Sequence, residues 1–155
     1  MIEAAASLAQ NSPGPMPSTA VASRSIECAN LIRRTAKTQD DDEVVQLSES
    51  YRGRFALDFA YEPWSASYRD SMHAAYLGVI ESAVARHIGA GENLRALRLA
   101  RRAVEVDPEA EELELSLLRV YRNLGAAAAA AEQYEHYAAV VRETLGVDPP
   151  ALHEL

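Results

Sequence analysis

The sequence predicts an all-α fold, because two helical hairpins of matching spacing follow one another within residues 51–155. In the first hairpin a turn glycine precedes small residues and a proline, at Gly91, Ala96, Ala100, Ala103 and Pro108. The second hairpin repeats the turn glycine and the inner positions at Gly125, Ala130, Tyr134 and Tyr137. The glycines turn the chain, and the small residues let two helices approach closely.

This repeated spacing resembles the tetratricopeptide pattern, in which pairs of helices stack side by side. One such pair cannot bury its apolar face alone, so neighbouring pairs share an apolar interior. Stacked pairs form a binding surface more readily than a catalytic pocket. We therefore expect a tetratricopeptide-like helical hairpin array that works as an interaction module and is not an enzyme.

The N-terminal part is expected to contain a tail and two shorter helices. Residues 1–24 are predicted to form a disordered tail or linker, because their prolines cannot sustain a helix. Residues 25–37 are predicted to form a helix with one apolar face, made of Ile26, Ala29, Ile32 and Ala36. The acidic run at 39–43 favours the start of a helix over 44–51. That run lacks the glycine and the ligand spacing of a calcium loop.

A long helix is predicted to begin at Pro63, after a buried connector that contains Phe55, Leu57 and Phe59. Its apolar stripe is the clearest helical pattern in the chain and consists of Trp64, Tyr68, Met72, Ala75, Tyr76, Val79, Ile80, Ala83, Val84, His87 and Ile88. We interpret the aromatic residues of this stripe as core, and His87 as a hydrogen-bonded core histidine.

Three further helices are predicted over residues 92–106, 109–124 and 126–145. In the first of these, the residues expected to point inward are Leu94, Leu97, Ala100 and Val104. Asp107-Pro108-Glu109 has the N-cap, proline and early acid that favour a helix start. Asp148-Pro149-Pro150 is expected to cap one more helix before Leu155.

Composition argues against several classes of function. The chain has 155 residues and a net charge of −8, which is unsuited to neutralising nucleic-acid phosphates. Its single cysteine, Cys28, excludes an internal disulfide and a zinc site of several thiolates. No apolar run approaches the length of a membrane span, and Met1 to Gln10 has no basic region of a secretory signal. We expect a cytoplasmic protein.

Neither a metal site nor a catalytic group is expected. A metal site in a helical bundle needs ligands one turn apart on facing helices, and Asp70 with His73 is one pair without a matching second. The acids at Glu109, Glu111, Glu112 and Glu114 are explained by their place at the start of a helix. No glycine-rich phosphate loop or nucleophile motif occurs, so no cofactor is expected.

Five short motifs occur in one order: Tyr51-Arg52-Gly53-Arg54-Phe55, Glu62-Pro63-Trp64, Asp107-Pro108-Glu109, Leu124-Gly125 and Leu145-Gly146-Val147-Asp148-Pro149. In that order the chain resembles the bacterial transcriptional activator domain of the antibiotic-regulatory activators of actinomycetes, over residues 25–155. The resemblance implies an all-helical, tetratricopeptide-like bundle that supports transcription activation and helps dimers form. It also implies an N-terminal winged-helix DNA-binding domain, which residues 1–24 are too short and too rich in proline to provide.

The partners expected from this resemblance are proteins: a DNA-binding domain, another copy of the chain, or RNA polymerase. Direct binding of this chain to nucleic acid is not expected. An arginine stripe at Arg95, Arg98, Arg101 and Arg102 is one candidate contact surface, although a solvated outer face explains it as well. Tyr134 and Tyr137 are a second candidate, as the lining of a groove or as ordinary packing residues.

Two other functions stay open at this point. The chain can be a stand-alone helical-repeat adaptor that holds a peptide in its groove, without a role in transcription. It can also be a sensor that binds a small molecule between its helices.

Overall fold

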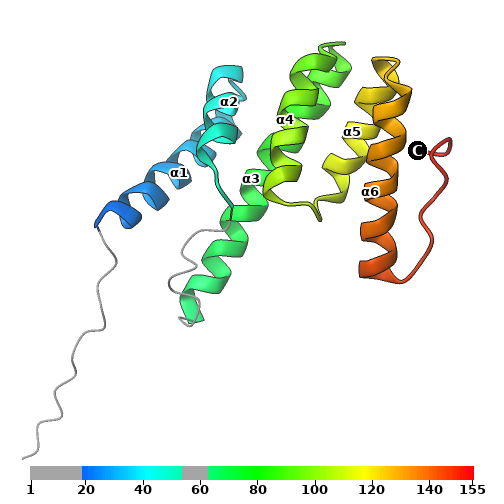
Figure 1. Cartoon of the computed structure of the whole chain (residues 1–155). Helices are drawn as coiled ribbons and strands as arrows, with labels where there is room; N and C mark the ends of the chain where they lie inside the picture. The colour runs from blue at the N-terminus through cyan, green and yellow to red at the C-terminus, as the bar shows by residue number, and fades with distance from the viewer. Residues whose placement is uncertain (1–18, 54–62) are drawn as a thin grey trace, which may run out of the picture.

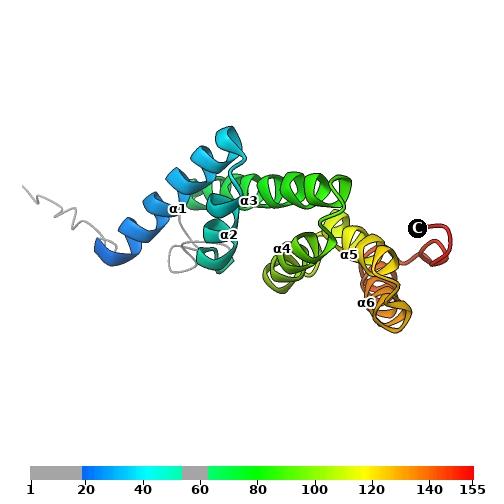
Figure 2. The ribbon, with the colours of Figure 1, turned by 90° about the horizontal axis from the view of Figure 1, so that it is seen from above.

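The computed structural model describes residues 19–53 and 63–155, and the described part contains helices and no strand. The helices are α1 (Thr19–Thr38), α2 (Asp41–Ser50), α3 (Pro63–Gly89), α4 (Asn93–Val106), α5 (Glu111–Asn123) and α6 (Ala127–Leu145). Successive helices run antiparallel as hairpins (Figure 1). Seen from above, α1–α2 and α5–α6 lie at opposite ends of the array (Figure 2). The predicted all-α, tetratricopeptide-like hairpin array is confirmed.

Several boundaries differ from the prediction. The first helix begins at Thr19 rather than at residue 25, so the last six residues of the expected tail are helical. Helix α5 begins at Glu111 rather than at Glu109, because Asp107 ends α4 and a turn follows at Pro108 and Glu109. The expected helix after Pro150 is not formed, and residues 152–154 make a turn instead. Residues 1–18, the connector at 55–59 and the side chain of Trp64 lie outside the described residues.

Small residues on α4 allow its close packing against its neighbours. Ala96, Ala100 and Ala103 are fully buried and belong to one apolar cluster that extends from α1 to α5. The largest fully buried side chains of α3 in this cluster are Tyr76 and Ile80. The α3–α4 hairpin and helix α5 therefore share one interior, whereas the buried residues of α6 (Ala130, Tyr137, Ala138 and Val141) lie outside this cluster.

Five residues that were expected to face the interior are exposed, namely Ile26, Ala36, Tyr68, Ala75 and Leu94. Leu94 is 69% exposed because it lies two residues before buried Ala96, and positions two apart on a helix face opposite sides. Ile26 is 59% exposed and lies in the first half of α1, which extends past α2 (Figure 1). Tyr68, in the first turns of α3, is 40% exposed. Helical spacing alone does not show how far along a helix its neighbours reach.

The turns follow the glycines and the acidic run. Gly91 and Gly125 have φ values of +76° and +68°, which favour glycine, and they lie in the α3–α4 and α5–α6 turns. Asp40 caps α2, since its Oδ1 accepts a hydrogen bond of 3.0 Å from the Glu43 backbone N–H. Gln39 has a φ of +51°, an uncommon conformation outside glycine, and its carbonyl accepts 2.7 Å from Arg86 Nη1.

A buried polar chain joins α2, α3 and the α4–α5 turn. Tyr51 Oη and His73 Nδ1 are 2.9 Å apart, and His73 Nε2 lies 2.6 Å from Asp107 Oδ2. A carboxylate only accepts, so Nε2 donates to Asp107, and Nδ1 forms the hydrogen bond with the tyrosine hydroxyl. Tyr51 also stacks on Tyr76 with ring centroids 3.9 Å apart.

Replacing Tyr51 by phenylalanine tests how much the hydrogen bond between Tyr51 and His73 stabilises the fold. Tyr51→Phe keeps the stacked ring but leaves the buried His73 Nδ1 without this hydrogen-bond partner, which costs about 1–3 kcal/mol. We expect the free energy of unfolding in urea to fall by that amount. The control Tyr68→Phe removes a hydroxyl from a partly exposed ring and is expected to change stability by less than about 0.5 kcal/mol. Equal losses in the two variants would contradict a specific role of the Tyr51 hydroxyl.

Candidate interaction surfaces

The arginine stripe of α4 is divided between two faces of the helix. Arg95 Nη1 lies 3.0 Å from Asp41 Oδ2 on α2. Arg102 donates from Nε to the carbonyl of Ser48 at 3.3 Å and from Nη2 to that of Tyr51 at 3.4 Å. A cation at the last carbonyls of α2 is favourable for the helix dipole. These two arginines link α4 to α2, and their role in binding a partner stays a prediction.

Arg98 and Arg101 point away from the interior. Both are exposed, and neither forms a hydrogen bond or an ion pair within residues 19–53 and 63–155. Leu94 lies four residues before Arg98 and seven before Arg101, so the three side chains share one side of α4. We call Leu94, Arg98 and Arg101 the α4 outer face.

Both candidate tyrosines of α6 make hydrogen bonds within the array. Tyr137 is 4% exposed, and its hydroxyl donates 3.1 Å to Glu111 Oε1 across the α5–α6 contact. The hydroxyl of Tyr134 donates 3.0 Å to the carbonyl of Pro150, in the C-terminal segment that runs back beside α6 (Figure 1). Both side chains are engaged in packing that holds the end of the array together.

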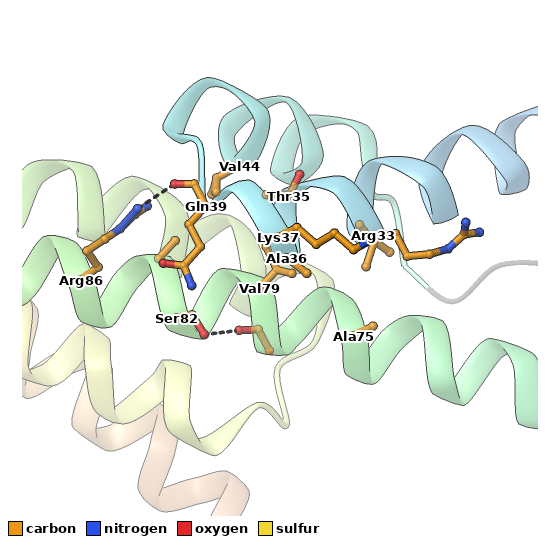
Figure 3. A pocket seen from close by; sticks show the side chains of 13 residues that line it. Arg33, Thr35, Ala36, Lys37, Gln39, Val44, Ala75, Val79, Ser82 and Arg86 are labelled. Carbon is orange, nitrogen blue, oxygen red and sulfur yellow. Dashed lines mark hydrogen bonds between the residues drawn. The ribbon is translucent and has the colours of Figure 1, made fainter.

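A groove between α1 and α3 was not predicted from the sequence. It has a volume of about 410 Å³ and is lined by Ile32, Arg33, Thr35, Ala36, Lys37, Gln39, Val44, Ala75, Gly78, Val79, Ser82, Ala83 and Arg86. Figure 3 shows Arg33 and Lys37 on its α1 side and Ala75 and Ser82 on its α3 side. We call it the α1–α3 groove. The sequence does carry one trace of it, since exposed small residues recur on α3 at Ala75, Gly78 and Ser82.

An ionic cluster joins the start of α2 to the end of α3 and the α3–α4 turn. His87 Nδ1 is 2.6 Å from Glu92 Oε2, and its Nε2 is 3.5 Å from Asp41 Oδ1. The spacing of these three side chains would suit a metal ion. However, Arg86 and Arg95 already pair with the two oxygens of Asp41, which favours an internal ion network over a cation site. The buried, hydrogen-bonded state predicted for His87 is confirmed, and the absence of bound metal remains a prediction.

Glu114 is buried, which its predicted place at the start of a helix does not by itself indicate. It is 2% exposed, it accepts a hydrogen bond from Gln133, and its Oε1 lies 3.4 Å from His136 Nε2. It also lines a smaller pocket of about 240 Å³ between α5 and α6. Burial raises the pKa of its carboxyl, and the contacts with Gln133 and His136 lower it in part.

This raised pKa gives a testable dependence of stability on pH. In the folded chain Glu114 keeps its proton to higher pH than in the unfolded chain, whose glutamates have a pKa of about 4.3. The contribution of Glu114 to stability therefore falls as pH rises from that value through the folded pKa. We expect Glu114→Gln to raise the melting temperature at pH 7, and the gain to shrink on acidification toward about pH 4. Exposed Glu112→Gln is the control, and a gain of the same size there would contradict the assignment.

Comparison with known proteins supports the fold. A model of the bacterial transcriptional activator domain matches residues 28–155, which is most of the chain. No curated protein and no solved structure matches the chain significantly. Among the described residues, no helix is both long and apolar enough to cross a membrane. The order of motifs, the helical hairpin array and the extent of the family match agree, and the chain belongs to the bacterial transcriptional activator domain family.

Proposed function

We propose that this chain is the protein-docking part of a transcriptional activator and that it docks through the α4 outer face. The family supports a regulatory role in transcription activation. The observation that carries the proposal is that Arg98 and Arg101 are exposed beside exposed Leu94 and form no bond to a described residue.

The chemistry of this face suits an acidic protein surface. Arginine and large apolar residues are the types that protein interfaces use as anchors. Two guanidinium groups beside an apolar side chain can pair with carboxylates of a partner while the leucine is covered. Nucleic acid is a poorer candidate, because the chain carries a net charge of −8 and phosphate binding needs many cations.

Three protein partners are consistent with this surface: a DNA-binding domain, RNA polymerase and a second copy of the chain. A second copy supplies carboxylates on its own, since the chain has 23 acidic residues against 15 basic ones. The role of the helical array is the same with each of the three partners: it binds another protein and does not catalyse a reaction.

A catalytic role is not supported by the buried polar chain of Tyr51, His73 and Asp107. Its hydrogen-bond order resembles a proton relay, but Tyr51 is fully buried and His73 is 6% exposed. A general base must come within hydrogen-bond reach of a substrate proton, and both of these side chains are buried within the part of the chain that the structure describes. We interpret the hydrogen-bond chain of Tyr51, His73 and Asp107 as a structural link between helices.

A second candidate function is a helical-repeat adaptor that holds a peptide. The α1–α3 groove is the observation that favours it. The two functions are compatible, because the groove and the α4 outer face are formed by different helices.

The docking proposal predicts a selective effect of charge reversal. The double variant Arg98→Glu/Arg101→Glu is expected to lower retention of the docking partner at least about tenfold, since like charges placed together cost several kcal/mol. The measurement is retention of purified RNA polymerase, of a winged-helix activator or of a second tagged copy on the immobilised chain.

The matched control is Arg119→Glu/Arg122→Glu on α5, which makes the same change in net charge at exposed arginines. It is expected to leave retention within about twofold, because surface charges away from an interface contribute little. Retention of none of the three partners by the wild-type chain, or equal losses in both double variants, would overturn the proposal.

A further inference from the structure

We infer that the α1–α3 groove binds a short acidic segment of a partner protein. The apolar side chains of that segment lie in the groove, and two of its carboxylates face Arg33 and Lys37. The inference rests on the groove alone and does not require the α4 outer face. It adds a second contact surface to the chain.

The floor of the groove is kept low by small side chains. Ala36 on α1 and Ala75, Gly78 and Ser82 on α3 are exposed there. Gly78 lies in the interior of α3, where glycine weakens a helix relative to alanine. No heavy atom lies within 4 Å of the position that its Cβ would occupy, so no packing contact explains the glycine. Its effect is to open α3 to an occupant.

Apolar side chains form the deeper wall. Ile32, Val44, Val79 and Ala83 line the groove and are at most 9% exposed. The hydroxyl of Ser82 is not available to donate to a bound segment, because it already donates a hydrogen bond of 2.8 Å to the carbonyl of Gly78 within α3 (Figure 3). Leucine-like side chains would lose water against this wall, which is the main source of affinity in such pockets.

The charged side chains that line the groove are all basic: Arg33, Lys37 and Arg86. Arg86 is already held by Asp41 Oδ1 at 2.6 Å and by the carbonyl of Gln39 (Figure 3). Arg33 and Lys37 are exposed and form no hydrogen bond or ion pair with a described residue. A basic rim on a chain of net charge −8 selects a negatively charged occupant.

The spacing of these two cations favours a peptide over a fatty acid. Arg33 and Lys37 are four residues apart on α1, which is a rise of about 6 Å along the helix. Acidic residues one turn apart on a helical segment, or two apart on an extended one, have about the same separation. A single carboxylate on an alkyl chain would use one of the cations and leave the other unpaired.

The test uses a synthetic peptide as the probe. A fluorescein-labelled peptide of about 16 residues, long enough for partial helicity, carries leucine at helical spacing and glutamate elsewhere. Its binding to the full chain is followed by fluorescence anisotropy in about 0.15 M salt, where exposed charges more than roughly 8 Å apart are screened. We expect saturable binding, and no binding of the same peptide with lysine in place of glutamate.

Two sets of variants locate the site. Gly78→Leu fills the floor and is expected to weaken binding at least about tenfold, a change of 1.4 kcal/mol. Ala85→Leu adds the same side chain to α3 at an exposed position outside the groove and is the control. Arg33→Glu/Lys37→Glu is expected to abolish binding, whereas Arg119→Glu/Arg122→Glu, with the same change in net charge, is expected to leave it unchanged.

Gly78→Ala separates binding from folding. Alanine is expected to raise the melting temperature of the chain, because it favours the helix, and to weaken peptide binding, because its methyl group enters the floor. Weaker binding with higher stability cannot come from misfolding.

Three results would overturn the inference: no binding by the wild-type chain, equal losses in the groove variants and their controls, or displacement of the peptide by sodium laurate at lower concentration than by unlabelled peptide. The last result would assign the groove to a fatty acid. Arg98→Glu/Arg101→Glu should leave peptide binding intact, so failure here and failure of the docking proposal are distinguishable.

Discussion

The close approach of α4 to its neighbours is the constraint on which the rest of the array depends. Ala96, Ala100 and Ala103 have no exposed surface, and α4 packs against α2, α3 and α5. A larger side chain at these positions would push helices apart, because protein interiors are close-packed and tolerate added volume poorly. The same closeness brings Arg102 to the last carbonyls of α2 and Asp107 to His73. The polar ties are therefore consequences of the alanine spacing.

The fold could be predicted from the sequence, whereas the candidate sites could be predicted only in part. Periodicity shows that a helix has an apolar face, and glycines show where it turns, so the hairpins around Gly91 and Gly125 were found. Periodicity does not show which neighbour covers a given face. For that reason Arg95 and Arg98 looked equivalent, although only Arg95 meets Asp41. The α1–α3 groove was missed for the same reason, since it depends on how two helices separated by residues 39–62 pack.

Charged residues divide into those that hold the array and those that face outward. Asp41 joins Arg86 and Arg95 and thereby connects the start of α2 to α3 and α4. Arg98 and Arg101 on one surface, and Arg33 and Lys37 on another, have no such task within the described residues. Two basic surfaces on an acidic chain are consistent with the proposed contacts to acidic proteins.

The linear order of the helices has a consequence for local motion. Helix α6 packs mainly on α5, whereas α3 and α4 have neighbours on both sides. In an array whose units contact only their neighbours, opening is least costly at the ends. Backbone amides of α6 should therefore exchange with solvent earlier than those of α3 and α4, once the bond between Tyr134 and the C-terminal segment breaks. A protein that bound to α6 would slow amide exchange in that helix, and the exchange rates of the central helices would change little.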